Sequence, residues 1–254
     1  MSSVTQRIKE IKQPRGGYVN PKEFSVVHLD DIKELNIYEN IHPSIIGTVV
    51  DYMTRFMLNG RADHAFKISI MGATIARDTY KASELLTKIK GLDDESIIAA
   101  CQLTGYDHFF RMGTNISGFR PINALIPDNN TIDNIRTMVL RSISFFEKYG
   151  PITKDGFTFE GAYTDLIDSG DGDFLTKDTL WDFKVSKDNI KPTHTLQLLI
   201  YYIMGEYSIY DEFANIKNIG IYNPRLNNVY MLSVEKIPET IKNIVKKEII
   251  GITY

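Results

Sequence analysis

The residues from Gly170 to Ser186 read GDGDFLTKDTLWDFKVS, and this stretch constrains the fold more than any other part of the chain. It contains four aspartates and two lysines, together with large apolar side chains such as Phe174, Trp181 and Phe183. A solvated loop lacks such apolar groups, and a strand buried on both faces lacks the carboxylates. The pattern therefore predicts a hairpin of two strands with one apolar face and one polar face.

The register of this hairpin follows from a turn centred between Lys177 and Asp178. Side chains alternate across a strand, so this turn places Asp173 opposite Asp182. The polar face then carries Asp171, Asp173, Asp182 and Lys184, with Leu175 and Leu180 as apolar flanks. The opposite face carries Phe174, Trp181, Phe183 and Val185. A Lys-Asp turn lacks the glycine or asparagine that two-residue hairpins favour, so the register is a hypothesis.

Two facing carboxylates lie about 4.5–5.5 Å apart at Cβ and repel each other unless a cation or a proton compensates. Their hard oxygen atoms suit Mg²⁺ or Mn²⁺. Lys184 lies two residues after Asp182 on the same face, where its ammonium can orient an attacking water or stabilise developing charge. The alternative is a surface hairpin in which Lys184 pairs with an aspartate. The apolar neighbours Trp181 and Phe183 favour a central strand instead.

These residues resemble the signature of the PD-(D/E)xK nuclease superfamily, in which an acid precedes an acid-x-lysine strand. Gln197 and Tyr201, in HTLQLLIYY, look like the Gln-x-x-x-Tyr helix of its RecB-like, phage-type exonuclease branch. The resemblance implies a restriction-endonuclease-like core and divalent-metal-dependent hydrolysis of DNA phosphodiesters. It also implies catalytic or metal-binding roles for Asp173, Asp182, Lys184, Gln197 and Tyr201.

A looser similarity places Asp51, in GTVVDY, at the acid of a helical motif that precedes the sheet, which would make it a third metal ligand. The alternative for Asp51 is an ion pair with Arg55, one turn further along a helix. Asp165 is a rival for the first strand carboxylate, since many relatives show Gly-x-x-Asp there, but the facing register favours Asp173. Asp171 is either an outer-shell group or a turn residue.

Phosphate contacts come from basic side chains, and the candidates for DNA binding here are Lys187 and Arg225, followed by Lys191, Arg111 and Arg120. The formal charge of −3 provides no global basic field, so any DNA groove must be local. Cys101 is the only cysteine and is expected to be a buried thiol. His194 is expected to start a helix, and the histidines show no zinc-ligand spacing.

The organisation of the chain changes near Gly150. Residues 1–150 are expected to be mainly helical, with helices over 43–58, 64–78, 80–92, 94–110 and 131–150, and with irregular structure within the first forty residues at 14–24, in PRGGYVNPKEF. Residues 151–254 read as a strand-rich catalytic core, with strand-like runs at 158–168, 170–176, 179–186, 218–223 and 228–234. A helix near 194–207 and another near 238–250 complete it. We expect one nuclease domain of α/β (α+β) class with a mixed sheet flanked by helices.

The chain is therefore expected to be a Mg²⁺- or Mn²⁺-dependent DNA nuclease, and an exonuclease in particular. The alternatives are an inactive DNA-binding protein that keeps the fold and, with weaker support, a glycoside hydrolase that uses paired carboxylates. We expect no secretory signal and no membrane span, and hence a cytoplasmic location. End polarity, strand preference and oligomeric state stay open.

Overall fold

The computed structural model describes residues 2–31, 33–113 and 122–253. They form two compact units. The first, here called the sheet unit, combines Met1–Asp30 with Phe145–Tyr254, and the second, the helical unit, is Asp31–Ser144. The expected change of character at Gly150 lies close to the point where the chain returns to the sheet unit. That the whole chain is a single nuclease domain stays a prediction.

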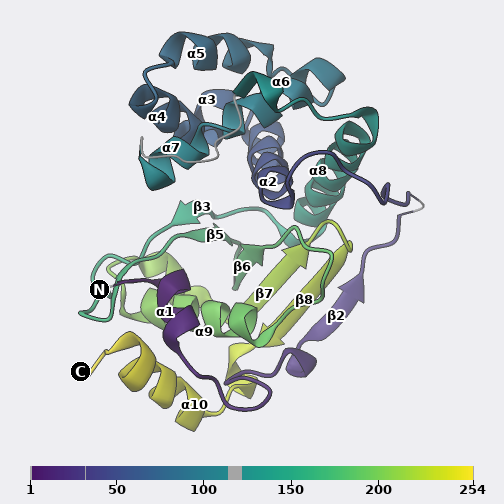
Figure 1. The fold of residues 1–254 in the computed structure, drawn as a ribbon. Coiled ribbons are helices and arrows are strands. Elements are labelled where there is room, and N and C mark those ends of the chain that lie inside the picture. The colour runs from purple at the N-terminus through teal and green to yellow at the C-terminus, as the bar shows by residue number, and fades with distance from the viewer. Residues whose placement is uncertain (1, 32, 114–121, 254) are drawn as a thin grey trace. The chain divides into compact units, whose positions relative to one another are not determined.

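The sheet unit is built on a six-stranded mixed sheet in the order β2-β8-β7-β6-β5-β3 (Figure 1). In that order the strands are Ser25–His28, Asn228–Ser233, Asn218–Asn223, Thr179–Phe183, Gly172–Leu175 and Lys154–Phe157. Strands β6 and β7 run parallel, and the other neighbouring pairs are antiparallel. Strand β6 is therefore an interior strand, as its apolar residues predict.

A second, parallel sheet joins only β1 (Ser2–Ser3) and β4 (Ile167–Ser169). The helices of the sheet unit are α1 (Val4–Glu10), α9 (Pro192–Tyr207), α10 (Glu239–Ile244) and the π-helical segment η5 (Val245–Ile250). Short 3-10 turns are η1 (Pro21–Glu23), η3 (Asp211–Asn215) and η4 (Val234–Lys236). The mixed sheet with flanking helices agrees with the α/β (α+β) class expected from the sequence.

Both faces of the six-stranded sheet are covered. On one face, buried residues of α9, including Leu196 and Ile200, join Leu180 and Ile221 of the sheet in a large apolar cluster. On the other face, an aromatic cluster joins Phe145 and Phe146 of helix α8 (Asn129–Tyr149) to Phe174, Trp181 and Tyr222. Burial of this apolar surface is the main driving force for assembling the unit.

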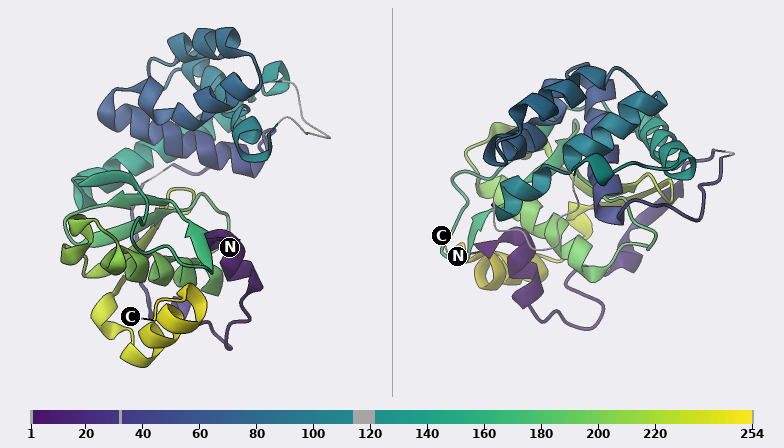
Figure 2. Two further views of the ribbon diagram at one scale, coloured as in Figure 1. Left: turned by 90° about the vertical axis from the view of Figure 1, so that its left-hand side faces the viewer. Right: turned by 45° about the horizontal axis from the view of Figure 1, so that its top comes forward.

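Residues 14–24 are irregular apart from the short turn η1, as expected, but the segments on either side contribute α1 and the edge strand β2 to the sheet unit, which the sequence did not predict. Val4 and Ile8 of α1 are buried in the cluster beneath α9. Arg7 donates from Nε to the carbonyl of Ile249 at 3.1 Å, which joins α1 to η5, and both views of Figure 2 show these two segments side by side. A seven-residue helix of this kind depends on tertiary packing, so local sequence signals are weak there.

Two further boundaries differ from expectation. A strand was expected at 158–168, but strand β3 lies ahead of it, at Lys154–Phe157. Within the expected run, only residues 167–168 form a strand, as part of β4. The helix expected over 94–110 is broken between α6 and α7 at Gly105, where a Cβ would lie 2.6 Å from Leu125 Cδ1. In both cases non-local packing overrides the local pattern.

The helical unit confirms the helical expectation for this part of the chain. Its helices are α2 (Pro43–Asn59), α3 (Ala62–Ala65), α4 (Lys67–Ile75), α5 (Thr79–Lys88), α6 (Asp94–Thr104), α7 (Asp107–Met112), the 3-10 turn η2 (Ile122–Ala124) and α8 up to Ser144. Pro43 occupies the first turn of α2, as the sequence predicts. Arg120 lies outside the described residues.

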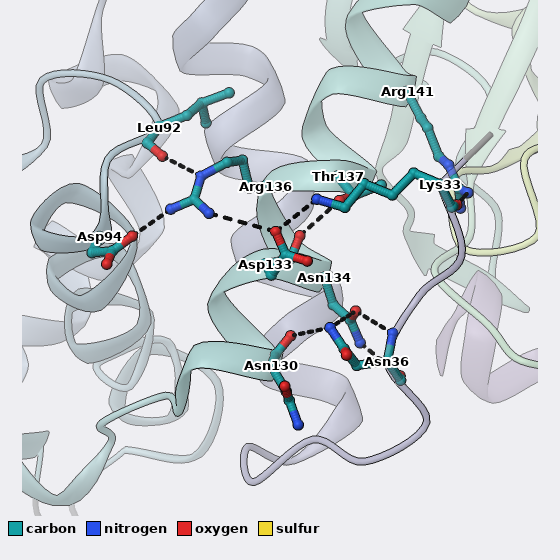
Figure 3. Close-up of polar contacts among 10 residues, drawn as sticks. All are labelled: Lys33, Asn36, Leu92, Asp94, Asn130, Asp133, Asn134, Arg136, Thr137 and Arg141. Atoms are coloured by element: carbon teal, nitrogen blue, oxygen red, sulfur yellow. Dashed lines mark hydrogen bonds and ion pairs between the residues drawn. The ribbon is translucent and has the colours of Figure 1, made fainter. Parts of the chain in front are cut away.

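Polar side chains attach the segment that precedes α2 to helix α8 (Figure 3). Asn134 accepts the Asn36 amide at 2.7 Å and donates back to the Asn36 carbonyl at 2.9 Å. Lys33 pairs with Asp133 at 2.7 Å, and Arg136 donates to the Leu92 carbonyl at 2.8 Å. The contacts of Asn134 satisfy backbone groups in the segment before α2, and that of Arg136 satisfies a carbonyl between α5 and α6, where neither segment has regular secondary structure.

Candidate active site

The hairpin of β5 and β6 has the register that the sequence predicts. Phe174 pairs with Trp181, and Leu175 pairs with Leu180. Continuing this register places Asp173 opposite Asp182. Phe174 and Trp181 point into the aromatic cluster, whereas Leu175 and Leu180 belong to the cluster under α9. Because side chains alternate, Asp173 and Asp182 lie on the α9 face of the sheet.

Trp181 and Gly220 hold β6 firmly against its neighbour β7. Trp181 is 2% exposed, and its indole donates to the Thr176 hydroxyl at 3.0 Å. A Cβ built on Gly220 would lie 2.3 Å from Cζ3 of this indole, so only glycine fits under the ring. The aromatic face thereby fixes the strand that carries Asp182 on its other face.

Asp173 reaches across the hairpin to the backbone of β6. Its Oδ2 accepts a hydrogen bond from the backbone N–H of Phe183 at 2.7 Å. This bond orients the carboxylate toward the segment that carries Asp182 and Lys184. A carboxylate that accepts a backbone N–H is fixed in position, as a ligand or catalytic group needs to be.

Lys184 forms an ion pair with Asp182, the most buried acid of the group. Lys184 Nζ lies 3.0 Å from both Oδ1 and Oδ2 of Asp182, whose side chain is 4% exposed. Burial of the Lys184 ammonium opposes its charge, but the carboxylates of Asp182 and Asp173 outweigh burial and raise its pKa above the ordinary value. Lys184 is therefore cationic at neutral pH and compensates the two carboxylates.

Gln197 and Tyr201 extend this polar group into helix α9. Gln197 Oε1 accepts from Lys184 Nζ at 3.3 Å, and Gln197 Nε2 donates to the Tyr201 hydroxyl at 2.9 Å. Burial, followed by the charge of Asp182, raises the pKa of Tyr201, so its phenol stays protonated. The structure thus joins Asp182, Lys184, Gln197 and Tyr201 into one chain of contacts, with Asp173 beside it.

His194 lies at the start of the same helix. Its Nδ1 accepts the backbone N–H of Lys191 at 3.3 Å, so this residue closes the first turn of α9, as expected. Burial, with the nearby charges of Lys184 and Lys191, lowers the pKa of His194 to about 4. The imidazole is neutral at physiological pH.

The two alternative carboxylates lie elsewhere. Asp165 is exposed in a bend ahead of β4, outside the six-stranded sheet. Asp171 is exposed just before β5, and its charge acts on Tyr163 and Tyr201. The geometry therefore favours Asp173 over Asp165 as the first strand carboxylate.

Asp51 belongs to the helical unit. Its Oδ1 accepts from Arg55 Nε at 2.8 Å, one turn further along α2, which is the ion pair that the sequence left open as an alternative. A role for Asp51 in metal binding stays a prediction.

The expected DNA-contacting residues divide between the units. Lys187 is exposed in the segment after β6, and Arg225 is partly buried in the turn between β7 and β8. Lys191 pairs with Asp188 at 2.7 Å. Arg111 lies in α7 of the helical unit. Sequence reasoning missed the buried Asn223 at the end of β7, since a lone asparagine before Pro-Arg reads only as a turn signal.

The helical unit contains its own cavity of about 810 Å³. It is lined by residues of α2, α6 and α7, among them His42, Asp107, His108 and Arg111. Asp107 is buried and accepts from the Tyr52 hydroxyl at 2.7 Å, and burial raises the pKa of this carboxyl. The expected catalytic and metal-binding residues do not line this cavity, and of the expected DNA-contacting residues Arg111 lines it.

Cys101 is buried in α6, and burial raises the pKa of its thiol to about 12. A thiol of this kind is unreactive at neutral pH, which confirms the structural interpretation of the cysteine.

The carboxylates of Asp173 and Asp182 supply oxygen atoms only, which fits a hard divalent cation. Mg²⁺ is commonly held by one or two carboxylates together with water and substrate phosphate. Across residues 2–31, 33–113 and 122–253, no group of three or more His, Cys, Asp or Glu side chains is arranged to hold a metal. That Asp173 and Asp182 bind a metal ion stays a prediction.

Comparisons of the chain with protein-family models, with curated proteins and with solved structures gave no match. Within the described part of the chain, no helix is both long and apolar enough to cross a membrane.

Proposed function

We propose that this protein is a divalent-metal-dependent DNA nuclease with a restriction-endonuclease-like core, and that it acts as an exonuclease. One observation carries the proposal. Asp173 and Asp182 come from adjacent strands in the expected register, and Lys184 bridges the second carboxylate to Gln197 on the following helix. These residue types, at these positions in the sequence, match the nuclease signature to which the chain shows a resemblance.

Each residue of the candidate site has its own role in the proposed reaction. Asp173 and Asp182 would hold the cation. Bound Mg²⁺ or Mn²⁺ supplies Lewis-acid polarisation of the scissile phosphate and lowers the pKa of the attacking water. Lys184 orients the nucleophile or stabilises the negative charge that develops on the phosphoryl oxygens.

Gln197 and Tyr201 position the lysine. Because Gln197 Nε2 donates to Tyr201, its Oε1 is directed at Lys184 Nζ. The amide therefore holds the ammonium in place without removing its charge. The chain of contacts ends at the phenol of Tyr201, which is buried. The position of the Lys184 ammonium is therefore fixed from the α9 side.

The proposal is tested by digestion of end-labelled linear duplex and closed circular DNA with Mg²⁺, Mn²⁺ or EDTA. We expect metal-dependent shortening of linear DNA from an end and intact circles. Asp182→Asn should reduce cleavage to the EDTA level, and Lys184→Gln should reduce kcat by about 10²–10³-fold, through loss of charge stabilisation at the phosphate.

Two matched variants control for nonspecific effects. Lys177→Gln removes an exposed lysine from the turn of the same hairpin, and Asp165→Asn removes the rival carboxylate. Both should cleave like the wild type, whereas Asp173→Asn should not. Loss of activity in Asp165→Asn with activity retained in Asp173→Asn would reverse the assignment of the first carboxylate. Wild-type protein that binds DNA without cleaving it would favour an inactive DNA-binding protein.

A further inference from the structure

Asn223 joins the two segments that carry the expected DNA-contacting cations of the sheet unit. It is the last residue of β7 and is 2% exposed. Phe183 pairs with Tyr222 in the parallel register of β6 and β7, and the Lys184 amide continues the ladder to the Tyr222 carbonyl at 3.0 Å. Asn223 is therefore the neighbour of Lys184 on the adjacent strand.

The Asn223 amide contacts both segments at once. Its Nδ2 donates to the carbonyl of Ser186, after β6, at 2.8 Å. Its Oδ1 accepts the backbone N–H of Arg225, in the turn after β7, at 3.0 Å, with longer contacts to the amides of Ser186 and Leu226 at 3.4 Å. A single buried side chain thus fixes the spacing between two loops that come from different parts of the sequence.

These loops carry cations next to the candidate site. Lys187 directly follows Ser186, and Arg225 lies two residues after Asn223. Asp188, the residue after Lys187, forms an ion pair with Lys191. Lys187 and Arg225 therefore lie on two neighbouring loops that begin beside Lys184. Phosphate contacts fix the register of a protein on a nucleic-acid strand, so the spacing between the cations that make them matters.

We propose that Asn223 is a positioning residue that aligns Lys187 and Arg225 as one phosphate-contacting edge for the DNA strand at the candidate site. The inference rests on the proposed function for its ligand. Asn223 itself touches no reacting atom. Asn223 affects the affinity for DNA. Because it acts through the two cations, it also affects how strongly binding depends on salt.

The test measures binding of a fluorescent DNA duplex by anisotropy in EDTA, over a series of NaCl concentrations. Each phosphate contact adds about 0.9 to the slope of log K against log[salt]. For Asn223→Ala we expect weaker binding and a slope reduced by about one to two units, because Lys187 and Arg225 no longer act together. In Mg²⁺ the same variant should raise KM for DNA about tenfold and leave kcat within about twofold of wild type.

The matched control is Asn228→Ala on the other arm of the same hairpin. The Asn228 side chain contacts His28 and Tyr230 but neither Ser186 nor Arg225. This variant should keep the wild-type salt slope, whatever its effect on thermal stability. A wild-type salt slope in Asn223→Ala would overturn the proposal, because a purely structural role lowers stability alone.

A double-mutant cycle adds a second test. In a Lys187→Gln, Arg225→Gln background, Asn223→Ala should cause no further loss of affinity, since the residues act as a unit. Additive losses would overturn the positioning role. A different result would overturn the nuclease proposal alone: wild-type protein that binds the duplex with a steep salt slope but does not cleave it in Mg²⁺. Wild-type protein that does not bind DNA would overturn both proposals.

Discussion

At the scale of single residues, the candidate site is a small set of charges whose positions depend on hydrogen bonds to neutral groups. Asp173 is held by a backbone N–H, and Lys184 by the Gln197 amide. Removing Lys184 leaves Asp182 buried with less compensation, and breaking a buried pair in this way costs about 3–5 kcal/mol. Thermal unfolding should therefore accompany every activity measurement on Lys184 variants, with Lys184→Arg as the variant that keeps the charge.

His194 makes stability depend on pH. Its pKa in the folded protein, about 4, lies below the ordinary value of 6.5, because burial and the charges of Lys184 and Lys191 outweigh Asp188. The unfolded chain therefore binds more protons between these two values. The contribution of neutral His194 to stability is complete above pH 6.5 and is lost as the pH falls toward 4.

We expect His194→Gln to lose less stability than the wild type between pH 7 and pH 4.5. In a fully buried group, a pKa shift of this size corresponds to about 3 kcal/mol of folding stability. Solvent screening at the half-buried imidazole reduces this contribution to about 1 kcal/mol. Urea denaturation at the two pH values measures the difference. Equal loss in both proteins would show that His194 does not carry this dependence.

At the scale of secondary-structure elements, the position of the site depends on the packing of β6 against β7. The indole of Trp181 covers Gly220 on the aromatic face, while Asp182 occupies the α9 face of the same strand. Crowding on one face therefore moves the carboxylate on the other, because the strand between them is rigid.

Gly220→Ala tests this coupling. The new Cβ would overlap the Trp181 ring, so we expect destabilisation of about 1–3 kcal/mol and reduced cleavage of DNA. Gly91→Ala is the matched control, since its Cβ would meet only Asp93 Oδ2, at 3.8 Å, and its effect should stay within about 0.5 kcal/mol. Unfolding in urea, followed by fluorescence of Trp181, gives both values. Equal stability of the two variants would contradict the packing argument.

At the scale of the whole molecule, the chain leaves the sheet unit at Asp30 and returns to it at Phe145, with the helical unit between. The candidate site lies entirely in the sheet unit, on β5, β6 and α9. A ligand that binds there stabilises the folded sheet unit by mass action.

We therefore expect Mg²⁺ to raise the melting temperature of the wild type relative to EDTA. At a concentration of about 100 Kd the stabilisation is about 2.7 kcal/mol. The double variant Asp173→Asn, Asp182→Asn should show no such increase, whereas Asp165→Asn should keep it. Scanning calorimetry measures all three proteins, and an unchanged Mg²⁺ effect in the double variant would place the cation elsewhere.

The sequence by itself determined the hairpin of β5 and β6, its register and the division of its two faces. These features follow from the two-residue alternation of side chains, which is a local property of a strand. The helix of Gln197 and Tyr201 and the long helices α2 and α8 were equally predictable, because apolar residues at helical spacing mark them.

The tertiary structure alone decided which other segments meet at this hairpin. It brought β2 and α1 from the N-terminus into the sheet unit and moved β3 ahead of the expected run. It placed Asn223 beside Lys184 and Asp165 outside the sheet. The physical reason is that these outcomes depend on contacts between residues far apart in the chain, whose energies outweigh local preference and leave no periodic signal in the sequence.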